Sequence, residues 1–394
     1  MTTATPTKFK KTEIGLIPEE WNVLPIYELA QWINGLAFKN IHFSPSGKPV
    51  VKINELKYGV TGQTQFTEDM FDEKYHLHKN DLLFSWSGSP DTSIDAFWYD
   101  LPDGWLNQHI FKVKPKESVF VDFLYYIFKT YKQRFIEIAR DKQTTGLGHV
   151  TLADIKRFYV ALPPMTEQTK ITEILSSLDD KINLNSEINA NLEKLATTLF
   201  KKWFVDIEDE LPEGWRIGTF GEAVENFDSK RIPLSSMERK PGSYPYYGAT
   251  SIMDYVEDYI FDGTYVLLGE DGSVAKKDGK PFVQYVSGKI WVNNHAHVLQ
   301  GKNGFSTEYI KVFLDQVNIV PFVTGAVQPK LNQANMNSVP MIIPDQKTLI
   351  KFNEILSVLF GMILENESQT KNLEQVRDSL LPKLMSGKIR AKPL

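Results

Sequence analysis

Two long segments of the chain carry apolar residues at alternating steps of four and three, which is the spacing of a coiled-coil seam. The first extends from Glu167 to Trp203, after the helix breaker Pro163-Pro164, and contains no Gly or Pro. Its seam positions are Ile171, Leu175, Leu178, Ile182, Asn185, Asn189, Leu192, Ala196, Leu199 and Trp203. The same stepping returns 181 residues later, after Pro344, at Phe352, Leu356, Leu359, Ile363, Asn366, Thr370, Leu373, Arg377, Leu380 and Leu384. The pattern predicts two long helices with matching seams.

Asn185 and Asn366 occupy corresponding places in the two seams. A polar residue at a seam position lowers stability but fixes register, because a slipped partner would leave its amide unpaired. This correspondence predicts that the two helices pair with each other. The alternative is that each helix packs on its own domain. However, a helix of about 37 residues spans ~55 Å, which exceeds the width of a domain of ~150 residues.

The rest of the chain forms two globular parts, which antiparallel pairing of the helices would hold at opposite ends of a dumbbell with a pseudo-two-fold axis. In these parts, short runs of β-branched and aromatic residues alternate with Gly, Asp, Asn and Pro, which predicts strands. One helical stretch interrupts each part, Phe120 to Ala139 and Thr307 to Val317. The predicted fold class is α+β, with globular domains at 1–163 and 207–343 and long helices at 164–206 and 344–394.

Short motifs repeat in the same order in both halves. Ile17-Pro18-Glu19-Glu20-Trp21 returns as Leu211-Pro212-Glu213-Gly214-Trp215, and Trp105-Leu106-Asn107-Gln108-His109 returns as Trp291-Val292-Asn293-Asn294-His295. The spacing between copies is far above the roughly 20–50 residues of solenoid repeats. The chain therefore reads as two tandem copies of one module, which indicates a target with two similar halves.

Composition restricts the chemistry. The 394 residues include no cysteine, which excludes disulfides, thiolate zinc sites and a cysteine nucleophile. There is no run of about 18 apolar residues, and the first residues lack the apolar core of a signal peptide, so we expect a cytoplasmic protein with no membrane span. The net charge of −5 argues against the extensive basic surface that non-specific DNA binding requires, but not against local basic patches.

Known catalytic motifs are missing from the sequence. It has no Gly-x-x-x-x-Gly-Lys-Ser/Thr loop and no Gly-x-Ser-x-Gly elbow, and Leu162-Pro163-Pro164-Met165 lacks the residues with which an amino-methyltransferase grips a flipped base. Glu270 and Asp271 do not have the spacing of a metal-dependent nuclease site. His295 and His297 could ligate a metal, but no third ligand is evident, which favours a structural role.

Polar loops in the two halves leave alternatives open. Ser85-Trp86-Ser87-Gly88-Ser89 and Gly269-Glu270-Asp271-Gly272-Ser273 occupy matching places and are either turns or binding loops. The amides of Asn107-Gln108-His109 and of its counterpart suit contact with adenine, but a buried hydrogen-bonded scaffold explains their recurrence equally well. Thr144 to His149 and Thr324 to Lys330 offer backbone donors for phosphate or form plain turns.

Three further motifs carry a family resemblance. The chain opens with Thr12 to Trp21, it contains Leu162-Pro163-Pro164-Met165-Thr166-Glu167-Gln168 where the first long helix begins, and it closes with Arg377 to Ile389. With these motifs the chain resembles, over its whole length, the specificity subunits of type I restriction-modification systems. The resemblance implies two target-recognition domains that each read one half of an interrupted DNA site, and paired helices that set the gap between the halves.

The resemblance also implies partners. A specificity subunit has no cofactor or chemistry of its own, and it recruits two modification subunits, which use S-adenosylmethionine to methylate adenine. Restriction subunits with motor and nuclease activity use ATP and Mg²⁺. We expect the helix surface opposite the seam to dock the modification subunits, whose charges would supply much of the basic footprint that a chain of net charge −5 lacks.

On this interpretation, polar side chains of the loops enter the major groove of double-stranded DNA while basic side chains contact phosphate. The first-domain candidates are Lys39, Asn40, Trp86, Ser87, Gln143, Thr144 and His149. The second-domain candidates are Lys230, Arg231, Tyr246, Tyr247, Asp271, Ser273, Gln328 and Lys330. Because the two sets differ, the two half-sites should differ in sequence.

Other functions compete with this interpretation. The specificity chain of a fused type II system, which cuts on both sides of its site, would have the same architecture. A stand-alone regulator with two unlike half-sites would have to bind tightly without partners, which the acidic balance disfavours. A self-sufficient enzyme is disfavoured by the missing motifs.

Overall fold

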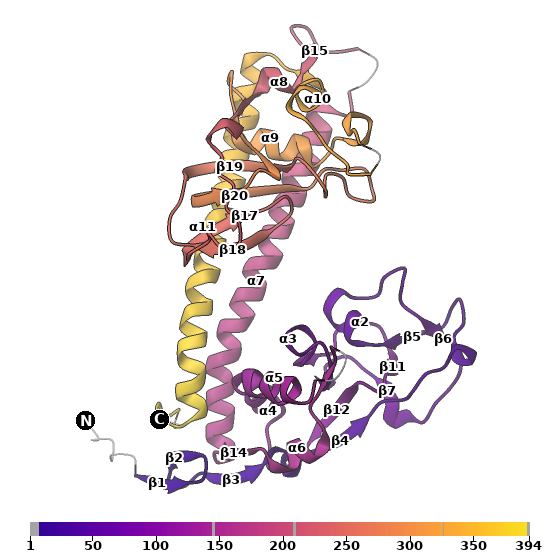
Figure 1. Ribbon diagram of the computed structural model, residues 1–394, viewed down its shortest axis with the longest axis vertical. Coiled ribbons are helices and arrows are strands. Elements are labelled where there is room, and N and C mark those ends of the chain that lie inside the picture. Colours follow the sequence, from indigo (N-terminus) through magenta and orange to yellow (C-terminus); the bar gives the residue numbers. More distant parts are fainter. Residues whose placement is uncertain (1–7, 144–145, 208–209, 326, 392–394) are drawn as a thin grey trace. The chain divides into compact units, whose positions relative to one another are not determined.

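The computed structural model describes residues 8–143, 146–207, 210–325 and 327–391. The chain forms two compact units: the first is Met1–Ile182 with Asn372–Leu394, and the second is Asn183–Lys371. Each unit holds one globular domain together with part of each of two long helices, α7 (Met165–Phe204) and α11 (Gln346–Met385) (Figure 1). The boundaries between the units thus fall inside the long helices. In the described part of the chain, no helix has an apolar stretch long enough to cross a membrane.

The two long helices confirm the prediction made from the seam pattern, and each is 40 residues long. α11 begins after Asp345, whose carboxylate accepts hydrogen bonds from the backbone N–H (3.0 Å) and the hydroxyl (2.6 Å) of Thr348. A carboxylate in this place satisfies free N–H groups of the first turn and is favoured by the helix dipole. α7 begins after the two prolines. Because proline has no backbone N–H to donate, these residues end the preceding strand.

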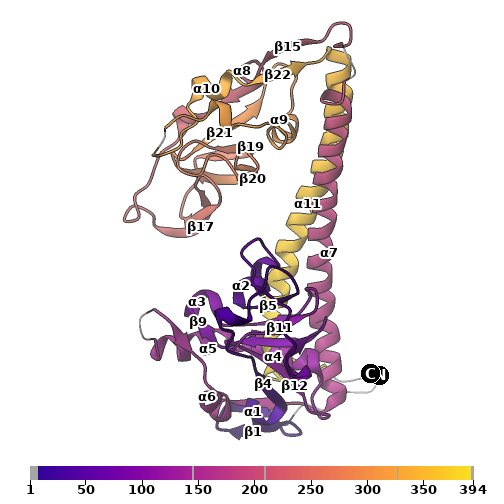
Figure 2. The same cartoon turned by 90° about the vertical axis from the view of Figure 1, so that its right-hand side faces the viewer.

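Within each unit the two helices pack against each other in antiparallel directions, and they lie side by side in both views (Figure 1, Figure 2). In the first unit, Asp179 of α7 accepts a 2.9 Å hydrogen bond from Arg377, near the end of α11. In the second unit, Phe204 at the end of α7 contacts Phe352 near the start of α11, with ring centroids 4.8 Å apart. Every seam position is buried or half-buried.

The globular domain of the first unit is built on two small four-stranded sheets. One has the order β10-β8-β12-β4 and is antiparallel throughout; the other has the order β6-β5-β11-β7. The strands are β1 (Phe9–Thr12), β2 (Gly15–Pro18), β3 (Asn22–Pro25), β4 (Ala30–Asn34), β5 (Lys48–Val51), β6 (Phe66–Thr67), β7 (His76–Leu77), β8 (Leu82–Ser85), β9 (Ser87–Gly88), β10 (Asp95–Trp98), β11 (Gly104–Leu106), β12 (Ile110–Pro115), β13 (Gly148–His149) and β14 (Tyr159–Leu162).

Short helices pack against these sheets. They are α1 (Ile26–Leu29), α2 (Ile53–Tyr58), α3 (Pro90–Ser93), α4 (Val121–Thr130), α5 (Lys132–Asp141) and α6 (Leu152–Arg157), with 3₁₀ turns η1 (Asn40–His42) and η2 (Glu73–Tyr75). The predicted helix from Phe120 to Ala139 is thus two helices. They break at Tyr131, whose ring packs edge-on against Phe158 (5.2 Å). All four residues of β8 are buried, because helices cover the face turned away from the second sheet.

The globular domain of the second unit contains one six-stranded sheet with the order β16-β21-β19-β20-β17-β18. Only β17 and β20 are parallel neighbours in it. The strands of the whole domain are β15 (Arg216–Thr219), β16 (Val224–Asn226), β17 (Pro241–Tyr247), β18 (Ile252–Val256), β19 (Phe261–Gly269), β20 (Val283–Val292), β21 (Ala296–Gly301) and β22 (Pro340–Ile343). Its helices are α8 (Phe220–Ala223), α9 (Thr307–Leu314) and α10 (Gln333–Asn337), with turns η3 (Asp228–Lys230) and η4 (Val320–Phe322).

The repeated Trp motif fastens each domain to the start of a long helix. The indole N–H of Trp21 donates to Glu167 in the first turn of α7 (2.9 Å), and that of Trp215 donates to Asp345, just before α11 (3.0 Å). In both domains the strand after the Trp pairs with the strand that leads into the long helix, β3 with β14 and β15 with β22. The motif recurs because both copies need the same anchor.

Candidate functional site

Several loops of the first domain meet at Trp86. Its backbone N–H donates to the carbonyl of His109 (3.2 Å), and its own carbonyl accepts from the N–H of Val150 (2.8 Å). The indole is stacked on Phe111, with centroids 5.5 Å apart and planes at 25°, and its N–H donates to the side chain of Asn34 (3.0 Å). These contacts hold the half-buried indole in one orientation.

A further candidate, His149, lies beside this indole. The ring of His149 is 5.9 Å from that of Trp86, and Nδ1 of His149 lies 2.8 Å from the hydroxyl of Ser87. Gln143, six residues before His149 in the chain, is exposed and donates to the carbonyl of Gly146 (2.8 Å). We call Trp86, His149 and Gln143 together the first rim.

Three other first-domain candidates stand apart from this rim. Ser87 is buried and holds His149 rather than facing solvent, so the prediction that it contacts DNA is wrong for this conformation. Lys39 and Asn40 are exposed at turn η1, and their side chains form no hydrogen bond or ion pair within the described ranges. Thr144 lies outside the described residues.

His109, whose ring lies 5.8 Å from that of Trp86, has a lowered pKa. Burial, and secondly the charge of His149, lower the pKa of His109. His109 is therefore neutral at neutral pH, with one ring nitrogen to donate and one to accept.

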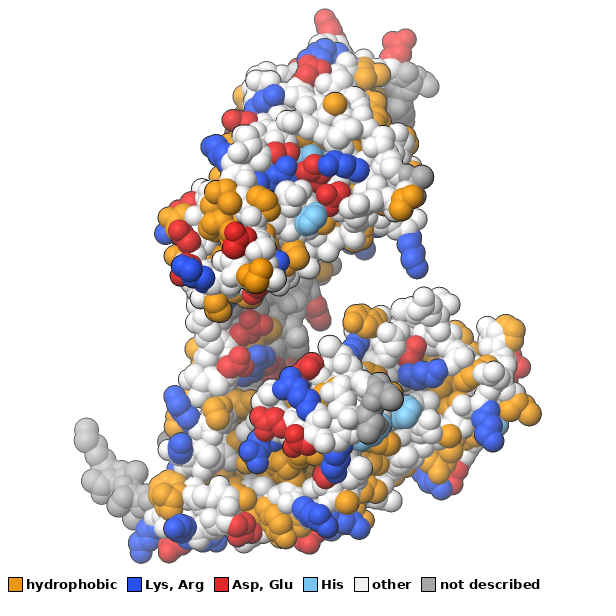
Figure 3. Space-filling model, viewed as in Figure 1, with side chains coloured by type: hydrophobic (Ala, Val, Ile, Leu, Met, Phe, Trp, Pro, Cys, Tyr) orange, Lys and Arg blue, Asp and Glu red, His pale blue; other side chains and the backbone are white. Residues whose placement is uncertain are grey.

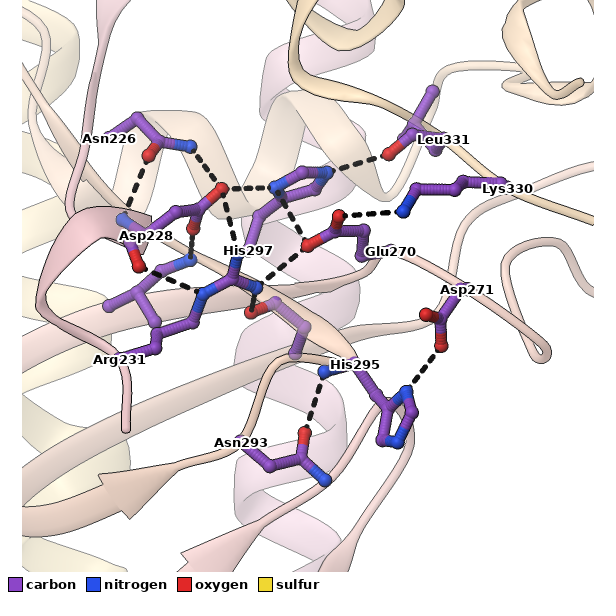
Figure 4. Close-up of polar contacts among 12 residues, drawn as sticks. Asn226, Asp228, Arg231, Glu270, Asp271, Asn293, His295, His297, Lys330 and Leu331 are labelled. Carbon is purple, nitrogen blue, oxygen red and sulfur yellow. Dashed lines mark hydrogen bonds and ion pairs between the residues drawn. The ribbon is translucent and has the colours of Figure 1, made fainter. Parts of the chain in front are cut away.

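Glu270 takes the place of Trp86 in the second domain. Its N–H donates to the carbonyl of His295 (2.9 Å), and its carbonyl accepts from the N–H of Leu331 (2.8 Å), which repeats the backbone frame around Trp86. The carboxylate lies 2.7 Å from Arg231 and 3.4 Å from Lys330 (Figure 4). The frame is thus conserved between the two copies while the side chain it presents changes from an indole to a carboxylate.

His297 lies at the centre of a buried ion network. Its Nδ1 is 2.6 Å from Asp228, and its Nε2 is 2.7 Å from the carbonyl of Leu331 (Figure 4). Burial would raise the pKa of Asp228, but hydrogen bonds led by that from His297 outweigh it and lower the pKa, so this carboxylate is ionised. Arg231 donates to Glu270 (2.7 Å) and to the carbonyl of Ala296 (2.6 Å). The arginine is therefore a structural cation here, not an exposed phosphate contact.

Sequence reasoning missed this cluster. Ligand atoms of Asp228, Glu270 and His297 lie within 4.8 Å of one another, so His297 has the partners that no local spacing reveals. Two cations face the two carboxylates of this trio, Arg231 at both and Lys330 at Glu270.

The exposed edge of the second domain carries the remaining candidates. Asp271 bonds to Nδ1 of His295 (2.5 Å) and pairs with Lys330 through a β-bridge. Ser273, Gln328 and Lys330 are exposed, and with His295 and Asp271 they form the second rim. Lys230 is also exposed, with its ammonium 4.9 Å from the ring centroid of Phe227.

The two candidate tyrosines of β17 are not at the surface rim. Tyr246 is 1% exposed, and its hydroxyl accepts from the N–H of Leu234 (3.0 Å), so the prediction that it contacts DNA is wrong. Tyr247 is half-buried, and burial raises its pKa. Alternation along the strand turns Tyr246 into the core.

The family model for the type I restriction modification DNA specificity domain matches residues 18–194 and, a second time, residues 212–375. The chain belongs to this family. It is 26% identical to the type I restriction enzyme MjaIX specificity subunit of Methanocaldococcus jannaschii, over 98% of each chain. It is 22% identical to the type I restriction enzyme HindI specificity subunit of Haemophilus influenzae, over 80% of this chain and 88% of that one.

The fold is also that of a solved specificity subunit. The S subunit of a type I restriction-modification system from M. genitalium matches with a TM-score of 0.58 at 17% identity, over 97% of this chain and 99% of that one. The two specificity domains of this chain therefore belong to a known architecture.

Both specificity domains use the Asn-x-His motif as a scaffold. Asn107 and Asn293 are buried, and their side-chain oxygens accept from the backbone N–H of His109 (3.4 Å) and His295 (2.8 Å). These amides are occupied within the protein. The scaffold alternative is therefore favoured over adenine contact for this motif.

Proposed function

We propose that this chain is the DNA-recognition subunit of a type I restriction-modification complex, and that each specificity domain reads one half of an interrupted site. The observation that carries the proposal is the double family match, with the same backbone frame around Trp86 and Glu270 presenting different side chains. A site with two unlike halves suits this arrangement, because a shared frame gives both domains the same approach to DNA while different rims select different bases.

Reading of the bases is assigned to the two rims. On the first rim, the Gln143 amide and Nε2 of His149 can pair with base edges, and amide side chains suit adenine. On the second rim, Gln328 offers an amide and Lys330 an ammonium that suits guanine or phosphate. Lys39 and Lys230 are exposed cations, and we assign them to backbone phosphates.

The helices α7 and α11 are assigned the setting of the gap between half-sites. They are long, they pair along a seam within each unit, and polar residues in that seam fix the register. A fixed register gives the helix pair a fixed length, and a fixed length is required if the pair is to set the gap between half-sites.

The remaining functions of the complex are assigned to partners. We infer two modification subunits, which bind S-adenosylmethionine and methylate adenine, and restriction subunits that use ATP and Mg²⁺; the chain itself carries no chemistry. Acidic and basic side chains are interspersed on the face in Figure 3, so partners would have to supply part of the basic footprint. With chromosomal and invading DNA as ligands, the complex would work in the cytoplasm.

Exposed apolar side chains on the long helices support two docking sites. Leu195 of α7 and Val376 of α11 are at equivalent repeat positions and are 45% and 46% exposed. Apolar side chains exposed at matching places suit two copies of the same partner.

Selection from a randomised DNA duplex library tests the proposal. The purified chain is incubated with the library, with and without the modification subunit, and the bound DNA is sequenced. We expect enrichment of two unlike half-sites at one fixed spacing, tightened by the partner. A contiguous motif bound equally well by the chain alone would indicate a stand-alone regulator instead. No enrichment in either condition would contradict the proposal that the chain recognises DNA.

A further inference from the structure

A second cluster of imidazoles and carboxylates lies in the first domain, where turn η2 runs into strand β7. One carboxylate oxygen of Glu73 is 3.3 Å from Nδ1 of His76 and 3.0 Å from Nε2 of His78. Ligand atoms of these three residues all lie within 4.8 Å of one another. Such spacing suits ligands that share one ion at bonds of about 2.0–2.2 Å.

Asp103 lies on the other side of both rings. Its carboxylate is 3.6 Å from Nε2 of His76 and 3.5 Å from Nδ1 of His78. In metal sites, the second nitrogen of a ligating imidazole usually donates to a carboxylate, which orients the ring and raises its basicity. Asp103 is placed to do this for both rings at once.

Lys48 competes with an ion for His76. Its ammonium is 2.7 Å from Nε2, so in the absence of an ion this nitrogen accepts and the ring proton is on Nδ1, facing Glu73. An ion at Nδ1 displaces that proton, and the proton moves to Nε2, facing Asp103. Lys48 must then withdraw. Its ammonium therefore opposes metal binding.

The other such trio, Asp228, Glu270 and His297 of the second domain, has a cation of its own. There Arg231 is 2.7 Å from Glu270 and 3.5 Å from Asp228, and it supplies the positive charge. Around Glu73, the sole cation in direct contact with a ring nitrogen in the described part of the chain is Lys48, which sits on the side away from Glu73. The Glu73 side is thus free to receive an ion.

We propose that Glu73, His76 and His78 bind one divalent transition-metal ion of the zinc class, with Asp103 as the outer carboxylate. Two imidazoles and a carboxylate are ligands typical of Zn²⁺, and they disfavour Mg²⁺ and Ca²⁺, which take oxygen ligands. The ion joins η2 to β7 through adjacent residues of the chain. Nothing in the DNA-recognition assignment requires it.

The site connects to the candidate DNA surface through a chain of packed rings. His76 packs on Trp105 (4.9 Å), Trp105 on Phe71 (5.2 Å) and Phe71 on Phe38 (5.2 Å), which immediately precedes Lys39. An ion that fixes His76 would therefore stiffen the support of turn η1.

Titration of the full-length, tag-free chain with Zn²⁺ tests the proposal, after dialysis against a chelator and with calorimetric detection. Binding of one ion is expected, together with the visible absorption bands of a tetrahedral site when Co²⁺ replaces Zn²⁺. His78→Ala and Glu73→Gln alter exposed side chains, so these variants should fold and lose the binding. Asp103→Asn should weaken it by about 10–100-fold, and Lys48→Met should strengthen it.

His42→Ala is the matched control. His42 pairs with Asp69 at 3.1 Å on the same domain but has no second imidazole there. This variant should bind Zn²⁺ like the parent chain. The proposal is overturned if the parent binds no ion, if His78→Ala binds as tightly as the parent, or if His42→Ala loses binding to the same extent as His78→Ala.

Discussion

The side-chain amide of Asn366 donates a 2.8 Å hydrogen bond to the side-chain oxygen of Asn189. Across the same seam, the amide of Asn185 donates to Gln369 (2.9 Å) and to the hydroxyl of Thr370 (3.3 Å). Asn189 and Thr370 are equivalent positions of the repeat, as are the two donors. Each donor therefore bonds to the residue four positions after the other donor. This arrangement is possible in only one register of the antiparallel pair.

Replacing Asn366 by Leu should destabilise the chain by about 1–3 kcal/mol, because the half-buried oxygen of Asn189 loses its donor. The double variant Asn189→Leu, Asn366→Leu should recover most of this loss, because neither polar group is then left unpaired. Urea denaturation of the four chains of this double-mutant cycle measures the coupling. Ser368→Ala, at an exposed position of the same helix, is the control and should stay within about 0.5 kcal/mol of the parent. Strictly additive effects would show that the two amides do not interact.

The anchor of the first domain should give a pH-dependent stability. Burial would raise the pKa of Glu167, but hydrogen bonds from Arg390 and Trp21 outweigh it, so the folded pKa lies below the ordinary 4.5. A depressed carboxyl pKa contributes stability that is present above the unfolded value and is lost as pH falls through the folded value. Glu167→Gln should therefore cost about 3–5 kcal/mol at pH 7 and progressively less below pH 4.5.

Glu173→Gln is the control for this prediction, because Glu173 is an exposed residue of the same helix and, among the described residues, forms an ion pair with Lys170 alone. It should change stability little at any pH. Denaturation midpoints between pH 3 and pH 8 compare the variants. A Glu167→Gln penalty that is the same at pH 7 and in acid would contradict the assigned pairing with Arg390 and Trp21.

One glutamine in each rim provides a matched test of half-site assignment. Gln143→Ala should relax base preference in one half-site and Gln328→Ala in the other, by about 1–3 kcal/mol at the affected position. Each variant should leave the opposite half-site unchanged. Competition binding with single-base substitutions across the site measures this. Both variants relaxing the same half-site would contradict the assignment of one domain to each half.

The docking of partners should depend on Leu195 and Val376. Leu195→Glu and Val376→Glu each place a charge at an exposed apolar position, and each should release one of two modification subunits. The double variant should release both, while thermal stability stays close to that of the parent. The mass of the purified complex, measured by light scattering, counts the subunits. Retention of both subunits by the double variant would place the docking surface elsewhere.

The long helices could be predicted from the sequence because a seam is a local pattern that one chain segment carries by itself. The role of Trp21 and Trp215 could not, since their carboxylate partners Glu167 and Asp345 lie 146 and 130 residues away. The strand motif around Tyr246 was also ambiguous. Aromatic residues alternate with others there, and only the packing decides which face is inside.

The charged cluster of the second domain was hidden for a similar reason. His297 is 69 residues from Asp228, and Arg231 is 39 from Glu270, so no spacing rule connects them. The further partners of His297 could therefore not be found from residue spacing in the sequence. The zinc-class trio at Glu73 is local in sequence, but its outer partner Asp103 and its competitor Lys48 are not.

We propose that two domains read separate half-sites at a distance set by α7 and α11. The most direct test of this proposal adds one heptad to each helix, a copy of residues 176–182 after Ile182 and a copy of residues 372–378 after Asp378, which preserves the seam. Seven residues add about 10.5 Å, or up to about three base pairs of DNA. Library selection with the modification subunit should then return the same two half-sites with a longer gap. An unchanged gap, with binding retained, would contradict the assignment of the helices as the ruler.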